Sequence, residues 1–460
     1  MEMASARRRA ANKPTQGGGG GDHQIALWGA CVLLSSLSLL LAAASSGLGA
    51  ARLTGVTARE VGALFKATIS AVPAVHVAGG DNDGAGDASR YCTDDDDLLR
   101  SMSVDGEWVR AAADAEPRRR RALYEPGQCP FVDEGFRCSE NGRPDGDYAT
   151  WRWRPRRCTL PRFDAARLLE ILRGRRLVFA GDSIGRNQWE SMLCMLASAV
   201  AGDKQEGSIY EENGSPITKH KGFLSFRFRE HNCTIEHYRS PYLLRRGRLP
   251  RRSPERGGGG TIQLGAMDSR AARWKDADVL VLNTGHWWNQ ERLQRPGCYF
   301  QDGKKLRLNM SVDDAYQRAM VTLQKWIQKE VNTTRTLVVL RTYSPAHVRF
   351  RDSGGCAAET LPELNVSRIK LHRWPGILNP NFEALKKFET EKKKLHVMNV
   401  TLMTAQRRDG HPSVYNAAPW SRTTPAAVGN RVADCSHWCL PGVPDAWNEL
   451  LYALIVRRFM

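Results

Sequence analysis

The segment Leu177–Trp189 limits the fold of this chain more than any other stretch. It begins with an apolar run, continues with Gly181, Asp182 and Ser183, and then takes up a helical pattern of apolar residues. This order predicts a short buried strand, a tight turn and an amphipathic helix. A serine on such a turn projects its hydroxyl from the carboxyl end of a sheet. There it lies beside helix N-terminal N–H groups that can stabilise an oxyanion.

A second segment near the C-terminus, from Asp434 to His437, supplies a histidine and a carboxylate that could activate this serine. Residues three apart lie on the same side of one helical turn, so we expect Asp434 to accept a hydrogen bond from His437. The other ring nitrogen then faces Ser183. Taken alone, these two residues fit a capping aspartate beside a structural histidine as well as they fit a catalytic pair. Together with the Gly-Asp-Ser segment it predicts a nucleophile, Ser183, a base, His437, and an orienting carboxylate, Asp434.

The regular elements alternate along the chain. The pattern predicts strands at Arg176–Ala180, Asp278–Asn283, Thr336–Arg341 and Leu395–Thr401, and helices at Asp164–Arg173, Ile184–Ala199, Asp313–Lys329 and Trp447–Phe459. Continuous apolar strands separated by helices are typical of an α/β fold with a parallel central sheet covered on both faces. Catalytic groups should gather at the carboxyl ends of its strands.

Polar residues follow these strands at the expected places. The second strand leads into Asn283-Thr284-Gly285-His286, and the third leads into Arg341–His347. Each segment alone could be a turn or a set of satisfied core residues. Together with the turn of the first strand, they make Gly181, Asp182, Asn283 and His286 candidates for binding substrate or an oxyanion.

The chain is basic, with 67 Lys and Arg against 49 Asp and Glu and a net charge of +18. Such a balance can indicate nucleic acid, a membrane surface or an acidic polymer as partner. The basic runs Arg118–Arg121 and Arg245–Arg252 are not interleaved with aromatic residues, so they favour solvated faces over nucleic-acid binding.

The N-terminal region predicts a membrane anchor. Ile25–Ala44 carries no charge and is long enough to span about 30 Å as a helix, with Arg7–Arg9 preceding it. We expect a disordered cytoplasmic tail at 1–24, an uncleaved signal-anchor at 25–44, a flexible lumenal stem at 45–90 and one domain at 91–460. Cleavage within Ala42–Ser46 is the alternative, and it too sends the domain into the secretory lumen.

Sequons and cysteines agree with a lumenal domain. Six N-x-S/T sequons follow the anchor, at Asn213, Asn232, Asn309, Asn332, Asn365 and Asn399. Of 11 cysteines, Cys31 lies in the anchor, and the even number that remains suits disulfides. Cys435 and Cys439 flank His437, but no second cysteine pair has zinc-finger spacing, so we expect no metal site.

Several motifs resemble the plant trichome birefringence-like family, a branch of the GDSL/SGNH esterase superfamily, from Cys92 to Met460. They are Trp151–Pro155 with Cys158–Phe163, Gly181–Trp189, Asn283–Trp288, Asp409–Ser413 and Asp434–Gly442. The resemblance implies a type II Golgi membrane protein that O-acetylates cell-wall polysaccharides with Ser183, His437 and Asp434. It also places Arg186 and Asn187 near the active site.

The resemblance further implies disulfides. They are Cys92 with Cys158, Cys129 with Cys194, Cys138 with Cys439, and Cys356 with Cys435, which leaves Cys233 and Cys298 as a candidate fifth pair. The segment Val348–Cys356 departs from the glycine-rich loop of some members and puts the shape of that loop in doubt.

The mechanism that follows is two-step acyl transfer through an acetyl-serine. No cofactor is expected to be bound; the acetyl donor, acetyl-CoA or an acetylated intermediate, is a co-substrate. The expected partners are a wall polysaccharide, the Golgi membrane and other wall-biosynthetic proteins. An esterase with the same triad, or a non-catalytic wall-polymer binding protein, are the alternatives. Gly297–Gln301 leans toward pectin-associated members, and the basic surface suits rhamnogalacturonan or glucuronate-bearing xylan.

Overall fold

The computed structural model describes most of the chain from residue 90 onward. The described ranges are 90–110, 123–200, 207–218, 221–248, 260–293, 299–307, 309–347, 356, 358–370, 395–417 and 433–460. The predicted tail, signal-anchor and almost all of the stem lie outside them. Within these ranges no helix has the length and apolar character needed to cross a membrane.

A seven-stranded sheet forms the centre of the domain, in the order β13-β12-β9-β3-β6-β5-β4. The strands are β3 (Arg176–Gly181), β4 (Ile209–Glu211), β5 (Phe223–Phe228), β6 (Cys233–Arg239), β9 (Val279–Asn283), β12 (Leu337–Arg341) and β13 (Leu395–Met398). The five from β13 to β6 are parallel to their neighbours, whereas β5 and β4 pair antiparallel at one edge.

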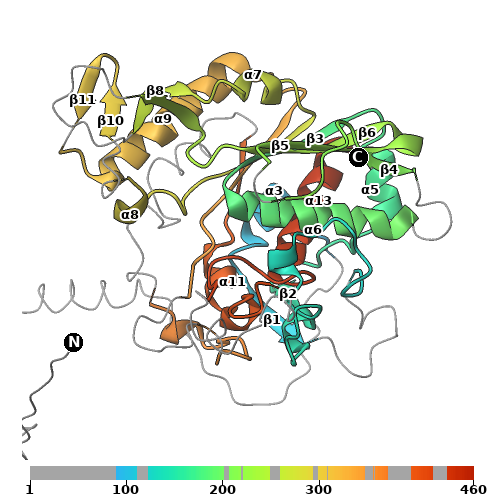
Figure 1. Ribbon diagram of the computed structural model, residues 1–460. Coiled ribbons are helices and arrows are strands. Elements are labelled where there is room, and N and C mark those ends of the chain that lie inside the picture. The colour runs from blue at the N-terminus through green and yellow to red at the C-terminus, as the bar shows by residue number, and fades with distance from the viewer. Residues whose placement is uncertain are drawn as a thin grey trace, which may run out of the picture. The chain divides into compact units, whose positions relative to one another are not determined.

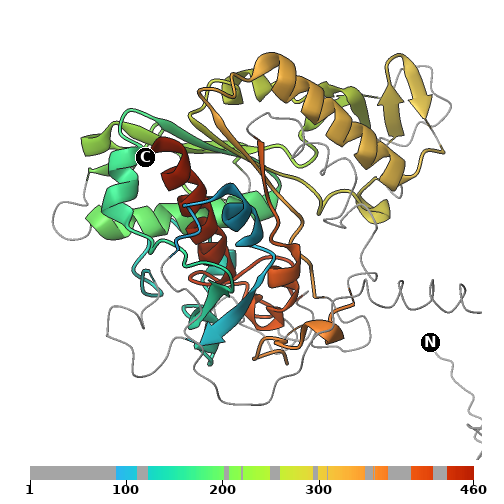
Figure 2. The same ribbon diagram turned by 180° about the vertical axis from the view of Figure 1, so that it is seen from behind.

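Successive residues of the central strands enter two different cores. On β3, Leu177 and Phe179 join one apolar cluster, while Val178 and Ala180 join another. The first core packs against α5 (Ala165–Ile171), α6 (Ser183–Ala197) and α13 (Val443–Phe459), and the second against α7 (Ala271–Trp274) and α9 (Val312–Glu330). Figures 1 and 2 show these two helical layers on opposite sides of the sheet. The predicted α/β fold with a covered parallel sheet is therefore confirmed.

Two smaller sheets were not predicted. One joins β7 (Leu244–Arg248), β8 (Gly260–Met267), β10 (Tyr299–Asp302) and β11 (Lys305–Arg307) beside α9. The other pairs β1 (Gly106–Arg110) with β2 (Trp151–Pro155), where the rings of Trp108 and Trp153 meet edge to face. The described residues also form the α-helices α3 (Asp96–Ser101), α8 (Gln290–Leu293) and α11 (Thr401–Ala405).

Four disulfides tie the loops to this framework. They join Cys92 to Cys158, Cys129 to Cys194, Cys138 to Cys439, and Cys356 to Cys435, the same pairs that the resemblance implied. Cys233 carries a free, buried thiol, so the structure does not support a fifth pair; Cys298 lies outside the described residues.

Candidate active site

Ser183 is the first residue of α6, and Asp182 alone separates it from the end of β3. Asp182 caps this helix, because its Oδ1 accepts hydrogen bonds from the N–H groups of Ile184 and Gly185. The helix is not amphipathic as predicted: every residue after Ser183 is buried, since the sheet, α5 and α13 all pack against it. Ser183 alone on α6 is half-buried, which leaves its hydroxyl open to a substrate.

Asn283, the last residue of the neighbouring strand β9, holds the turn before Ser183 in place. Its Nδ2 donates to Asp182 Oδ1 at 2.6 Å, so the end of β9 holds the cap of α6. This contact requires glycine at two positions. A Cβ on Gly181 would overlap Oδ1 of Asn283 and lie 2.5 Å from its backbone oxygen, and one on Gly185 would overlap Oδ1 as well. These candidates therefore build the turn that presents Ser183.

We expect Gly181→Ala to lower activity by about 100-fold, because the added methyl must displace Asn283 and with it the turn, and a shift of about 1 Å can cost that much. The measurement is kcat/KM together with the thermal unfolding midpoint. Gly265→Ala on β8 is the matched control, since a Cβ there meets nothing within 4 Å. Full activity in Gly181→Ala would show that the close approach of Asn283 does not position the serine.

His437 and Asp434 contact each other, but not in a helical turn as predicted. Asp434 forms a β-bridge with Ser413, and its Oδ1 accepts the N–H groups of Ser436 and His437. Its Oδ2 lies 2.7 Å from Nδ1 of His437. The tight turn thus achieves the contact through backbone capping.

The two side chains stabilise each other's charge. Burial raises the pKa of Asp434, but the charge and hydrogen bond of His437 outweigh burial and hold that pKa well below its usual range. Burial lowers the pKa of His437, but Asp434 outweighs burial here as well, so the pKa of the imidazole lies above its ordinary value of 6.5.

Asn187 fastens the His437 segment to the serine helix. Its Oδ1 accepts from the N–H of Trp438 at 2.8 Å, and its Nδ2 donates to the carbonyl oxygen of the same residue at 3.1 Å. Because Asn187 is four residues after Ser183, both lie on one face of α6. The residue that follows His437 is thereby held one helical turn from Ser183. This two-point contact gives Asn187 a positioning role.

Two further groups from strand ends lie within electrostatic reach of Asp182. His286 donates from Nε2 to the carbonyl oxygen of Ser344 at 2.8 Å and lies within electrostatic reach of Asp182 and His437. Burial lowers the pKa of His286 to about 4, so its ring is neutral at physiological pH. Arg341, which the sequence analysis named only as the start of the polar segment after the third strand, is buried at the end of β12 with its guanidinium over the ring of Trp447.

Arg186 is buried and pairs with Glu190 at 2.7 Å and with Asp133 at 3.4 Å. Burial raises the pKa of Glu190 to about 7 despite the opposing charge of Arg186. Nη1 of Arg186 makes no hydrogen bond within the part of the chain that the structure describes. Within the described residues, the buried NH₂ group at Nη1 of Arg186 therefore has no acceptor.

Metal ligation does not fit the cysteines beside His437, because Cys435 and Cys439 are both in disulfides. In the described ranges no cluster of three or more His, Cys, Asp or Glu could hold a metal ion. A cavity of about 1120 Å³ lies over α9, lined by Leu264, Asp302 and Arg318 among others, and none of its lining residues belongs to the serine–histidine site.

The sequons differ in their surroundings. Asn213, Asn232, Asn309, Asn332 and Asn365 are exposed. Asn399 is half-buried, its Oδ1 accepts from Thr342 Oγ1 and from the N–H of Thr401, and Thr401 is buried. Asn399 thus has a local structural role, which makes it the least accessible of the six sequons.

A serine on a strand-to-helix turn of an α/β sheet, and a His–Asp pair whose segment is held to the same helix through Asn187, are features of enzymes that transfer or hydrolyse acyl groups. Comparison with known families agrees. Residues 160–454 match the GDSL/SGNH-like acyl-esterase family found in Pmr5 and Cas1p, and residues 103–159 match the PMR5 N-terminal domain.

Several relatives are proteins of Arabidopsis thaliana. Protein trichome birefringence-like 9 is 41% identical over 76% of this chain and 82% of its own length. Protein trichome birefringence is 38% identical over 77% of this chain and 56% of its own length, and trichome birefringence-like 43 is 36% identical over 72% and 83%. The chain belongs to the trichome birefringence-like family.

Proposed function

We propose that this protein is a polysaccharide O-acetyltransferase that moves an acetyl group from a donor to a hydroxyl of a plant cell-wall polysaccharide. The observation that carries the proposal is the placement of Ser183. It is the accessible first residue of a buried helix, and Asn187 of that helix holds the His437 segment against it.

The chemistry proceeds in two balanced steps. Ser183 Oγ attacks the acetyl carbonyl while His437 Nε2 takes the serine proton, and the donor's leaving group departs with that proton. A sugar hydroxyl then attacks the acetyl-serine, gives its proton to His437, and leaves as the acetyl ester while Ser183 recovers the proton. Asp434 stabilises the imidazolium in both steps.

A backbone donor at the N-terminus of α6 is available for the oxyanion of each tetrahedral intermediate. Asp182 already occupies the N–H groups of Ile184 and Gly185, so these do not serve. We assign this role to the N–H of Ser183, at the helix N-terminus. Asn187 uses its amide on Trp438 and acts by positioning.

The sequence supports the location and the acceptor that we propose. The apolar run Ile25–Ala44 after Arg7–Arg9 supports a type II Golgi membrane protein with a lumenal catalytic domain. The net charge of +18 supports an anionic acceptor, pectin or glucuronate-bearing xylan. The donor is acetyl-CoA or an acetylated intermediate.

The test uses the full-length protein in detergent with acetyl-CoA and either pectin or xylan oligosaccharides. We expect acetylated oligosaccharides by mass spectrometry, and one acetyl group on the peptide containing Ser183 when the acceptor is omitted. Parallel incubation with pre-acetylated oligosaccharides measures released acetate.

Acetate release without transfer would make the protein an esterase. Oligosaccharide binding with neither reaction would make it a binding protein. Either result would overturn the proposed function.

A further inference from the structure

A pair of histidines lies directly behind the His437 segment. His411 Nδ1 is 2.7 Å from the carbonyl oxygen of His437. His411 Nε2 is 2.7 Å from Nδ1 of His347, and His347 Nε2 is 3.0 Å from the carbonyl oxygen of Ala405. The two rings therefore form a chain between two backbone carbonyl groups, and one of these belongs to His437.

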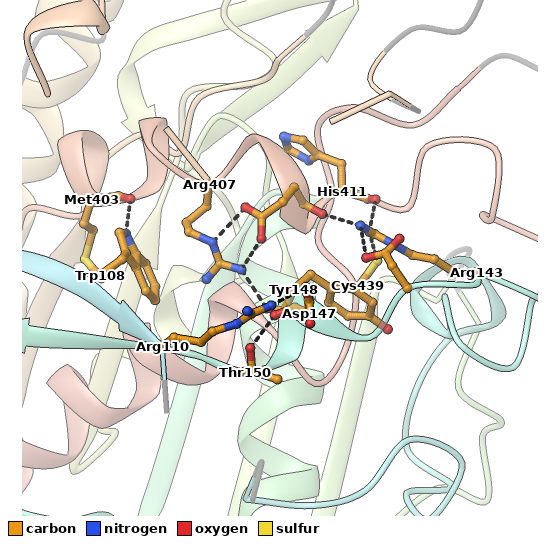
Figure 3. A network of polar contacts seen from close by, with 12 residues as sticks. Trp108, Arg110, Arg143, Asp147, Tyr148, Thr150, Met403, Arg407, His411 and Cys439 are labelled. Carbon is orange, nitrogen blue, oxygen red and sulfur yellow. Dashed lines mark hydrogen bonds and ion pairs between the residues drawn. The ribbon is translucent and has the colours of Figure 1, made fainter. Parts of the chain in front are cut away.

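Neighbouring groups hold both rings in place. The ring of His411 stacks on Trp438 with 4.0 Å between centroids, and its carbonyl oxygen accepts from Arg143 at 3.0 Å. Figure 3 shows that the ring of His411 lies on the far side of the residue from this guanidinium. The N–H of His347 donates to the carbonyl oxygen of Cys435, two residues before His437. Both histidines thus contact the segment that carries the base.

The number of protons that the two histidine rings must share follows from these three contacts. A carbonyl oxygen only accepts, so both outer nitrogens must carry a proton, and the inner contact needs a third proton between its two nitrogens. Two neutral imidazoles carry only two protons. With both outer contacts made, two neutral rings would set two lone pairs against each other 2.7 Å apart. All three contacts can exist only when the pair carries one additional proton.

We propose that His347 and His411 are positioning residues for His437, and that they hold its backbone carbonyl by sharing one additional proton. The inference rests on the proposed function only in taking His437 as the general base. Neither ring touches substrate. When the shared proton is lost, one of the three contacts must break. Because His347 remains bonded to the carbonyl oxygen of Ala405, we expect the contact between His411 and the carbonyl oxygen of His437 to weaken.

Charged groups face the pair from three elements. Arg143 faces His411 from the loop before β2. Asp434 and His437 face it from their own tight turn near the C-terminus. Arg408 and Asp409 face His347 from the turn after α11. Burial and the neighbouring positive charges lower the pKa of His411 to about 4 and that of His347 to about 3, which favours two neutral rings, although Asp434 and the carbonyl oxygen of His437 oppose this shift at His411. Two neutral rings cannot make all three hydrogen bonds of the pair, and for this reason we infer the shared proton.

Two substitutions at His347 separate this role from simple packing. In His347→Leu the ring of His411 loses its partner, and we expect kcat to fall by about 100-fold. In His347→Asn the side-chain amide replaces Nδ1 and donates to a neutral His411, which then needs no additional proton. We expect this variant to lose less than about tenfold in kcat. His231→Asn, at a histidine that contacts Glu170 on the surface, is the matched control.

The discriminating readouts are the pH profile of kcat and the ring protons seen by NMR with ¹⁵N-labelled histidine. The wild type should show three ring N–H protons on the pair and an alkaline limb in kcat where the third is lost. His347→Asn should lack that limb. Two neutral rings at every pH, or equal losses in the Asn and Leu variants, would overturn the proposal. If the wild type transfers no acetyl group, the proposed function fails, but the ring-proton spectrum still decides whether the proton is shared.

Discussion

Ser183→Ala is expected to reduce acetyl transfer by roughly 10⁴- to 10⁶-fold, because the variant lacks the Oγ atom on which the proposed acetyl-enzyme forms. The fold should not change. The Ser183 side chain is half-buried and makes no hydrogen bond within the described residues, so its removal should alter the free energy of unfolding by no more than about 0.5 kcal/mol. The measurement is single-turnover transfer with acetyl-CoA, together with thermal unfolding.

Ser198→Ala is the matched control at the other end of α6, where the exposed hydroxyl donates to the carbonyl oxygen of Met195. It should transfer acetyl groups at the wild-type rate. If Ser183→Ala retained more than about one hundredth of the wild-type rate, no covalent intermediate on this serine could explain the reaction.

The central strands could be predicted because both of their faces are buried. β3, β9 and β12 are nearly continuous apolar runs, which mark fully covered parallel strands. β6 was missed because its buried positions include Glu236 and His237. Glu236 is tolerated there because Arg176 on β3 pairs with it at 2.7 Å, and a partner on another strand leaves no local signal.

Element ends were predicted less well than their centres. α13 begins at Val443 rather than at Trp447, since Pro444 is accepted in a first turn and Asp445 accepts the N–H of Gly442. The predicted strand Leu395–Thr401 stops at Met398, because Thr401 already begins α11.

The residues of the candidate site also differ in how well the sequence predicts them. Ser183, Asp434 and His437 lie in short motifs whose chemistry can be inferred from residue type and spacing. The groups that place them are remote in sequence. Asn187 contacts Trp438 across 251 positions, and Arg143 contacts His411 across 268. Such contacts follow from tertiary packing, so the sequence alone gave Asn187 no specific role and did not single out Arg143.

Asp434→Asn should have the second-largest effect, a loss of roughly 10⁴-fold in kcat. An amide that keeps accepting the N–H groups of Ser436 and His437 through its oxygen presents its NH₂ group to His437 Nδ1. The imidazole must then carry its proton on Nε2, where it cannot accept the proton of Ser183. Steady-state kinetics would measure the loss, and Asp276→Asn, at an exposed surface carboxylate, controls for the change in charge.

The same substitution should move the pH profile in a defined direction. His437 must be neutral to act as base, so wild-type activity falls as the pH drops through the pKa of His437, which Asp434 holds above 6.5. Without the carboxylate the imidazolium loses its counter-charge, its pKa falls, and the acid limb of kcat moves to lower pH. The residual activity of Asp434→Asn should therefore persist at a pH where the wild type has already declined. A slow variant whose acid limb coincides with that of the wild type would mean that another group titrates there, and that Asp434 does not set the charge of the base.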